Sequence, residues 1–267
     1  SCWFLSYLVS CLIGGITFLL FTSNIDGQVI INEYSCSNVG AITDSDGDYE
    51  DWIELYNLSI NAIDLTGYTL NDKVSNTNTW VFPAITIPAD GYVLIFASEK
   101  DKKVGNELHT NFKLTQTKPE QLIFSDIQGN VLDSLTLKPA QIDHSRGRET
   151  DANPLWAVFT SPTPGNTNTN PKKEYAEKPQ FNLAAGYYNL SQSLVLSTSD
   201  PNLTIRYTTN GYEPTALSPA YNNPINLANT KVIRAQVFSS DPNVPASFIE
   251  TNTYFISNSH TLPVVAI

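Results

Sequence analysis

Short runs of apolar residues separated by turn residues form the recurring pattern of this 267-residue chain after its first 28 positions. Turn-forming pairs such as Asp90-Gly91 and Gly129-Asn130 lie between the runs. No segment after position 28 keeps the 3.6-residue apolar period of an amphipathic helix, so the pattern predicts β-strands packed as a sandwich. The strands expected in this first block are Val29–Tyr34, Trp52–Asn57, Ile63–Leu70, Thr79–Phe82, Tyr92–Ala97, Gln121–Phe124 and Val131–Leu137.

A second β-rich block follows a stretch with almost no apolar residue. That stretch, Thr160–Lys178, is rich in Pro, Asn, Thr and Gly, which favours a linker. Further strands are then expected at Ser193–Leu196, Leu203–Thr208, Lys231–Phe238 and Phe248–Ile256. The predicted fold class is therefore all-β, with two tandem β-sandwiches after an N-terminal apolar leader. The predicted boundaries are 29–168 for the first sandwich, 169–179 for the linker and 180–258 for the second sandwich.

The two ends of the chain differ from these blocks. Residues Cys2–Phe21 are nearly all apolar, so residues 1–28 are expected to be a signal peptide or a membrane anchor, with a cleaved signal favoured. Leu8-Val9-Ser10-Cys11 also resembles a bacterial lipobox. Each interpretation makes the protein secreted or attached to the cell surface. Residues 259–267 end in an apolar run with no partner strand and are expected to begin a further, truncated domain.

The charge and the cysteine content exclude several kinds of site. The formal net charge is −11, and Asp26 is the only charged residue before position 29. Nucleic-acid binding requires clusters of Lys and Arg, so no nucleic-acid partner is expected. Cys36 is the only cysteine after Cys11. We therefore expect neither an internal disulfide in the two blocks nor a zinc site built from cysteines.

An acidic loop between the first two expected strands is the candidate metal site. Asp44, Asp46, Asp48 and Asp51 supply carboxylate oxygens, the ligands that Ca²⁺ prefers. Counted from Asp44, the twelfth position is Leu55 rather than Glu, so the loop is not an EF-hand. We expect either a calcium site or a solvated acidic turn whose charge repulsion is screened by salt. No other cofactor is expected.

Two further sets of side chains have both a functional and a structural interpretation. Glu33 and Glu54 could form the carboxylate pair of a glycosidase, but we expect structural carboxylates at strand edges or strand ends. Trp52, Trp80 and Trp156 could form a sugar-stacking face or could lie in the core of a sandwich. For Trp80 and Trp156 the core is the preferred interpretation, whereas the burial of Trp52 stays open.

The remaining titratable candidates do not form a catalytic set. His109, His144 and His260 lie far apart in the sequence, with no nucleophile motif near them. Arg146 and Arg148 lie in an expected turn, where they would donate hydrogen bonds to carbonyls or to an acid of the same sandwich. No catalytic residue and no cofactor-binding residue is therefore predicted.

The first block resembles a known family through motifs that occur in the same order. The motifs are Val29-Ile30-Ile31-Asn32-Glu33, Trp52-Ile53-Glu54-Leu55-Tyr56-Asn57, Asp64-Leu65-Thr66-Gly67-Tyr68-Thr69-Leu70 and Ser161-Pro162-Thr163-Pro164-Gly165-Asn166. Over about residues 28–168 they are similar to the lamin-tail domain, and the resemblance implies an immunoglobulin-like β-sandwich. Unlike nuclear lamins, this chain has an apolar leader and no coiled-coil rod, so the resemblance implies no nuclear role.

The second block resembles the C-terminal β-sandwich of chitobiases and β-hexosaminidases over about residues 180–257. The resemblance rests on Ile205–Thr215, Tyr221, Pro224-Ile225 and Ile233-Arg234-Ala235, with Asn210 where that family has an acid. In those enzymes this module is not the catalytic domain, so the resemblance implies no hydrolysis. His260–Ile267 is similar to the entry strand of spore-coat-protein-H-like kinase domains.

These observations predict a non-enzymatic extracellular module for interaction, adhesion or scaffolding, with a protein or glycan partner at the cell surface. The alternative is a pair of accessory, carbohydrate-binding domains of a larger enzyme whose kinase-like domain begins after residue 261. A third option assigns carbohydrate binding to the second sandwich through Tyr207, Tyr212 and Tyr221. Membrane contact is expected only through an uncleaved leader.

Overall fold

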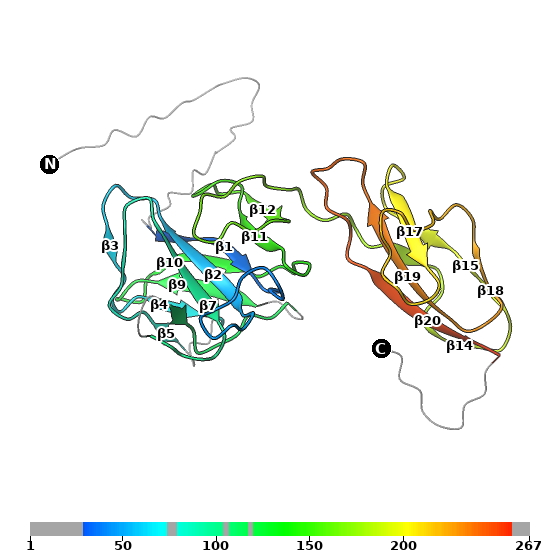
Figure 1. Ribbon diagram of the computed structural model, residues 1–267, viewed down its shortest axis with the longest axis horizontal. Helices are drawn as coiled ribbons and strands as arrows, with labels where there is room; N and C mark the ends of the chain where they lie inside the picture. The colour runs from blue at the N-terminus through cyan, green and yellow to red at the C-terminus, as the bar shows by residue number, and fades with distance from the viewer. Residues whose placement is uncertain (1–28, 74–78, 104–106, 117–119, 258–267) are drawn as a thin grey trace, which may run out of the picture.

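The computed structural model describes residues 29–73, 79–103, 107–116 and 120–257. Every regular element in these ranges is a β-strand, and the strands form two separate sandwiches (Figure 1). The predicted all-β class with two tandem sandwiches is confirmed. The predicted leader (1–28), the predicted further domain (259–267) and His260 lie outside the described residues. No helix in the described ranges is long and apolar enough to cross a membrane.

Two main sheets make up the first sandwich. Its strands are β1 (Val29–Ser35), β2 (Asp51–Asn57), β3 (Ile63–Asp64), β4 (Thr69–Asn71), β5 (Trp80–Val81), β6 (Thr86–Ile87), β7 (Tyr92–Ala97), β8 (Leu108–His109), β9 (Gln121–Ser125), β10 (Val131–Thr136), β11 (Ser145–Arg148) and β12 (Trp156–Phe159). The larger sheet has the order β12-β11-β1-β2-β7-β8, and the smaller has the order β10-β9-β4-β5. β3 and β6 form a separate short pair.

The core of the first sandwich lies between these two sheets. Ile53 and Leu55 alternate along β2 and point into it, as period-two side-chain placement requires. From the smaller sheet, Trp80 packs edge-on against Phe82, with 4.7 Å between the ring centroids, and Phe82 packs edge-on against Phe124. Burial of each such side chain stabilises the fold by roughly 1.5–3 kcal/mol.

The predicted strand Ile63–Leu70 is wrong in its middle, where the chain turns. The Asp64 carboxylate accepts hydrogen bonds from the Thr66 N–H at 2.9 Å and from the Thr66 hydroxyl at 2.5 Å. Gly67 then takes φ of +83°, a conformation that glycine adopts without strain. This local bonding competes with strand pairing, so the run becomes two short strands, β3 and β4, in different sheets.

The second sandwich has a smaller and simpler sheet arrangement. Its strands are β13 (Gln180–Phe181), β14 (Gly186–Tyr188), β15 (Gln192–Leu194), β16 (Leu196–Ser197), β17 (Thr204–Thr208), β18 (Ile225–Leu227), β19 (Lys231–Phe238) and β20 (Glu250–Ile256). The main sheet has the order β14-β20-β19-β17, and β13-β16 and β15-β18 form two short pairs. Ile233, Ala235 and Val237 point from β19 into a core that also buries Leu194 and Tyr254.

The segment expected to be a linker makes specific contacts with both sandwiches. Lys172 exchanges two backbone hydrogen bonds with Val158 of β12, at 2.7 and 3.1 Å. Tyr175 is 7% exposed, and its ring packs against Phe248 of the second sandwich. The Ala176 N–H donates to the carbonyl of Pro245 at 3.0 Å. Residues 172–176 are thus part of an ordered junction between the two sandwiches.

Candidate functional site

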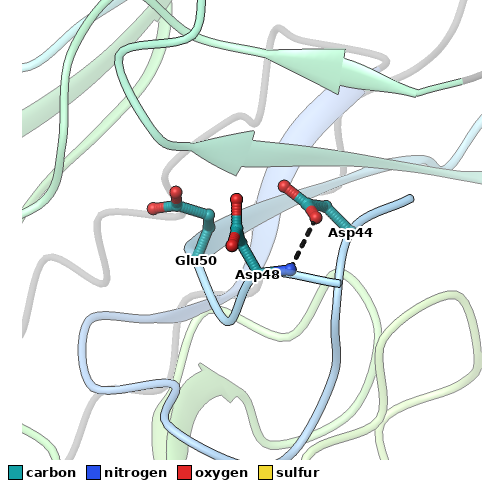
Figure 2. Close-up of side chains that lie close together, drawn as sticks. All are labelled: Asp44, Asp48 and Glu50. Atoms are coloured by element: carbon teal, nitrogen blue, oxygen red, sulfur yellow. Dashed lines mark hydrogen bonds between the residues drawn. The ribbon is translucent and has the colours of Figure 1, made fainter. Parts of the chain in front are cut away.

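The acidic loop folds around its first aspartate. The Asp44 carboxylate accepts hydrogen bonds from the N–H groups of Asp46 and Asp48, each at 2.9 Å. Its backbone N–H donates to the carbonyl of Asp48 at 3.0 Å, and Gly47 provides the turn with φ of +86°. These hydrogen bonds give the loop a defined shape, and the one from the Asp48 N–H to the Asp44 carboxylate is drawn in Figure 2.

Lys100, just after β7, places its ammonium group among these carboxylates. Its Nζ contacts Asp44 and lies 2.7 Å from Asp48 and 3.2 Å from Asp46. Glu50 contributes a fourth carboxylate at 4.0 Å. The hydrogen bonds that Lys100 donates, the one to Asp44 above all, raise the pKa of Lys100 above its usual value and keep it charged. The ammonium compensates the charge repulsion that the loop would otherwise contain.

Glu107 forms a second set of contacts with the loop. Glu107 accepts hydrogen bonds from both the N–H and the hydroxyl of Ser45, at 2.7 Å each. His109 at 3.0 Å and Lys102 at 2.8 Å bind the same carboxylate. Donors from His109, Lys102 and Ser45 together hold the pKa of Glu107 well below its usual range. The loop is thus fixed to the connection that follows β7 by charge-assisted hydrogen bonds.

The predicted metal ligands are only partly brought together. Ligand oxygens of Asp44, Asp48 and Glu50 lie within 4.8 Å of one another, and Figure 2 shows these three side chains side by side. Glu50 is not among the predicted ligands, although it continues the i, i+2 spacing of the aspartates. Asp51 instead accepts a hydrogen bond from the Asn38 N–H at 3.2 Å, and burial raises its pKa to about 6. The oxygen set suits a hard cation, but such an ion would have to displace the Lys100 ammonium.

Glu33 and Glu54 do not lie at strand edges or strand ends, so that prediction is wrong. They lie opposite each other on β1 and β2, two central strands of the six-stranded sheet, and both are completely buried. A β-bulge between Ile31 and Glu33 shifts the register at this point. The bulge turns Glu33 toward the same face as Glu54, outside the main core.

The segment after β12 covers this buried carboxyl pair. Glu33 accepts hydrogen bonds from the Ser145 hydroxyl, from the Thr163 N–H at 3.1 Å and from the Thr163 hydroxyl at 2.8 Å. Glu54 accepts from the Gly165 N–H at 2.5 Å and from the Asn32 amide at 3.1 Å. Both carboxyl groups are therefore engaged with the protein itself, which satisfies the requirement that buried polar groups have partners.

Within the described part of the chain, neither Glu33 nor Glu54 forms an ion pair with a Lys or Arg side chain, and burial dominates the titration of both carboxyl groups. Burial raises the pKa of Glu54 to about 8, against opposing hydrogen bonds from Asn32 and Gly165, and the nearby Glu33 charge adds to the rise. The pKa of Glu33 is raised as well, also by burial. At neutral pH the pair therefore holds a proton. It lacks the solvent-accessible gap in which a sugar and a water would react.

The two predicted arginine roles are confirmed, but both residues lie on β11 rather than in a turn. Arg148 donates to the carbonyl of Ile31 at 2.8 Å and to the carboxylate of Asp133 at 2.8 Å. Arg146 forms a bidentate pair with Glu174, at 2.7 and 2.9 Å. Both arginines therefore connect segments distant in the sequence within the first sandwich and its junction.

The described histidines belong to separate structural networks. His109 is buried between Ser98, whose hydroxyl lies 2.8 Å from its Nδ1, and Glu107. His144 lies at the junction, where its Nδ1 is 3.0 Å from the Tyr175 hydroxyl. Neither ring contacts a Ser or Cys nucleophile that also reaches open solvent, so these contacts are structural.

The aromatic candidates are mainly core residues. Trp52 and Trp80 are completely buried, and Trp156 is half-buried beneath the guanidinium of Arg148, 5.4 Å from the ring centroid. In the second sandwich, Tyr207 and Tyr221 pack against the core. Of the three tyrosines predicted for sugar binding, Tyr212 is the one with a large exposed fraction, 74%.

The comparisons with known proteins agree with this architecture. Residues 22–139 match the Lamin Tail Domain family, and residues 183–248 match the family described as the chitobiase/beta-hexosaminidase C-terminal domain. A search of curated proteins finds no match. Both sequence resemblances and their order are confirmed. The two matched families are non-catalytic β-sandwich modules, and the second is typical of extracellular proteins.

Proposed function

We propose that this chain, with its two β-sandwiches of non-catalytic families, is an extracellular interaction module that binds a protein or a glycan at a cell surface. The first sandwich serves as a rigid support, and the second provides the contact surface. One observation carries the proposal. The buried carboxyl groups of Glu33 and Glu54 are engaged internally, whereas two largely exposed tyrosines, Tyr187 and Tyr212, lie on the second sandwich.

The exposed aromatic groups of the second sandwich lie toward one end of its main sheet, on its two opposite edges. Tyr187 on β14 is 50% exposed and stacks on Phe255 of β20, with 4.7 Å between the ring centroids. Tyr212 follows β17, the opposite edge of the sheet, and Leu190 follows β14 with 74% exposure. The strand register brings the end of β17 and the end of β20 to the same side. We call these four residues the aromatic end.

The aromatic end has the chemistry of a contact surface for weakly charged partners. Tyrosine offers a flat apolar ring together with a hydroxyl, and such residues carry much of the binding energy at interfaces. The charge of this part of the chain is balanced, because residues 169–257 contain six acids and six bases. A neutral aromatic surface suits glycans and polar protein loops better than it suits a strongly charged partner.

Binding assays with matched variants test the proposal. Glycan-array and cell-surface binding of the chain is expected to weaken about tenfold or more in Tyr187→Ala and in Tyr212→Ala, the size of a typical hot-spot loss. Tyr49→Ala is the control, because Tyr49 is also 50% exposed but belongs to the first sandwich. If Tyr49→Ala loses binding while Tyr187→Ala and Tyr212→Ala retain it, the assignment of binding to the aromatic end is contradicted.

A further inference from the structure

One tyrosine hydroxyl lies at the centre of several contacts of the junction between the sandwiches. The Tyr175 hydroxyl lies 3.1 Å from the N–H of Gln141 and 3.0 Å from Nδ1 of His144. Its ring stacks on the His144 ring with 4° between the planes, and it also packs against Phe248 of the second sandwich, with 5.0 Å between the ring centroids. Tyr175 thus joins a turn of the first sandwich to the body of the second.

The first-sandwich side of this contact is firmly anchored. The carbonyl of His144 accepts a hydrogen bond from the Ser35 hydroxyl at 2.9 Å. The Asp143 carboxylate accepts from the N–H groups of Val39 and Gly40, and the Asp143 N–H donates to Ser37. A change at His144 therefore acts on Tyr175 and the second sandwich, because the histidine itself is held in place.

Few contacts hold the second sandwich at the junction. The Gln141 amide donates to the carbonyl of Ala246 at 2.7 Å, and Lys173 pairs with Asp241 at 2.9 Å. Backbone hydrogen bonds run from Lys173 to Asn243 and from Ala176 to Pro245. Exposed ion pairs such as Lys173–Asp241 contribute roughly 0–1 kcal/mol. The partly buried hydrogen bond of Tyr175 is therefore one of the stronger contacts of the junction, together with the bidentate Arg146–Glu174 pair.

The hydrogen bonds of Tyr175 suit a neutral His144. The hydroxyl oxygen of Tyr175 accepts the Gln141 N–H, and in the neutral tautomer with a bare Nδ1 its own proton is donated to His144. A protonated ring donates from both nitrogens. It would leave the Tyr175 hydroxyl proton without this acceptor, and it would place a second positive charge against Tyr175, whose ring centroid already lies 5.4 Å from the Arg146 guanidinium.

We propose that His144 and Tyr175 form a pH-dependent latch, which holds the second sandwich against the first at neutral pH and releases it in mildly acidic surroundings. Protonation of the His144 imidazole is the trigger, and loss of the Tyr175 hydrogen bond is its consequence. The latch would change the relative orientation of the two sandwiches without unfolding either one. The latch does not depend on which partner the aromatic end binds.

The titratable groups around His144 and Tyr175 support release of the latch at acidic pH. Burial lowers the pKa of His144 against an opposing effect of Asp143, so the docked state disfavours the protonated ring. Docking therefore weakens as the pH falls through the region just below the usual histidine value of 6.5. Arg146 lowers the pKa of Glu174 and keeps this acid charged in that range. The other charged groups near the latch are Lys138, Lys173 and Asp241.

Hydrogen–deuterium exchange of the full chain at pH 7.5 and pH 5.0, corrected for intrinsic exchange rates, tests the latch. Peptides covering 172–177 and 243–248 are expected to exchange at least about threefold faster at pH 5.0, while core strands stay protected. His144→Gln, which offers a non-titrating acceptor, should abolish the difference. Tyr175→Phe should exchange fast at both pH values. His109→Gln is the control and should retain the wild-type response.

Two outcomes would overturn the latch. One is equal corrected exchange of these peptides at the two pH values in the wild-type chain. The other is an unchanged pH response in His144→Gln, which would assign the effect to a different group. Nitrogen-15 NMR of the wild-type imidazole gives a test that needs no variant. Nδ1 of His144 should be an unprotonated acceptor at pH 7.5 and gain its proton over the same range in which exchange accelerates.

Discussion

The two sandwiches share a fold class but are held together by different means. The first buries charged and titratable side chains, among them Glu33, Glu54 and Arg148. In the second sandwich, the buried polar side chains among the described residues are Gln236 and Ser247, and the rest of the core is apolar. Residues 29–168 contain 19 acids and nine bases, whereas residues 169–257 contain six of each. The acidity of the whole chain thus belongs to the first sandwich.

This difference shows that two kinds of interaction, apolar burial and buried hydrogen bonds, can determine how a β-sandwich packs. In the second sandwich, a mainly apolar core stabilises a short sheet, with Gln236 and Ser247 as its buried polar side chains among the described residues. In the first, the outer face of the six-stranded sheet is also buried, and directional hydrogen bonds determine which segment covers it. Buried polar networks fix one arrangement when every member has a partner, and they become costly when one partner is removed.

The largest expected effect is the loss of a buried arginine. Arg148→Met removes the partner of Asp133 and the donor to the Ile31 carbonyl, so we expect the first sandwich to lose about 3–5 kcal/mol. Arg234→Met is the matched change in the second sandwich, where Arg234 pairs with the exposed Glu213, and it should cost about 0–1 kcal/mol.

Tryptophan fluorescence during urea unfolding can measure the Arg148 effect separately. Trp52, Trp80 and Trp156 all lie in the first sandwich, and residues 169–257 contain no tryptophan. The Arg234 variant is followed by circular dichroism, which reports on both sandwiches. Equal losses in the two variants would show that the buried arginine has no special role in the first sandwich.

The next effect concerns the pH dependence of the first sandwich. Because the pKa of Glu54 is about 8 in the folded state and near 4.5 when exposed, the folded state binds more protons between these values. Stability is therefore expected to fall as the pH rises, by about 1.4 kcal/mol per pH unit at most. Glu54→Gln should flatten this slope between pH 6 and 9, measured again by tryptophan fluorescence. A slope that the substitution leaves unchanged would contradict the role of Glu54.

A smaller effect is expected at the acidic loop. Lys100→Met leaves Asp44, Asp46 and Asp48 without their shared cation, and we expect a loss of about 1–2 kcal/mol in low salt. Millimolar calcium should raise the melting temperature of this variant, because an ion that binds only the folded state stabilises it. The wild-type chain should respond much less, since its ammonium already lies among the carboxylates. A larger calcium shift in the wild type than in the variant would contradict this account.

The smallest effect is expected at the aromatic end. Tyr212→Ala should change the stability of the second sandwich by less than about 0.5 kcal/mol, because the side chain is 74% exposed. Thermal melting followed by circular dichroism checks this. A loss above 1 kcal/mol would show that Tyr212 supports the fold, and its use as a binding probe would then be invalid.

The sequence predicted those strands that carry regular apolar positions. β7 and β19 were predicted with correct bounds, because Tyr92–Ala97 and Lys231–Phe238 are rich in β-branched, aromatic and aliphatic residues. β11 could not be found in this way, since Ser145–Arg148 contains two arginines and a glycine and has no apolar residue. Its burial depends on partners from distant segments, which a local pattern does not reveal.

The sequence predicted three aspartates of the candidate site but not the side chains that surround them. The i, i+2 spacing identified Asp44, Asp46 and Asp48 as a group. Lys100 lies more than 50 positions away in the sequence, and the pairing of β2 with β7 places it beside these carboxylates. In the same way, the burial of Glu33 and Glu54 depends on the β-bulge and on the later segment around Thr163. Such long-range pairings depend on the tertiary structure, and the spacing of residues in one sequence does not determine them.

The most direct test of the contrast between the two sandwiches is a carbon-13 NMR titration of the Glu54 carboxyl group. Glu54→Gln identifies the signal by its absence. We predict that the Glu54 carboxyl gains its proton near pH 8, because it is buried opposite Glu33 on central strands. Titration near the usual value of 4.5 would contradict the account, since the pair would then be ionised at neutral pH and the first sandwich would not depend on a buried proton.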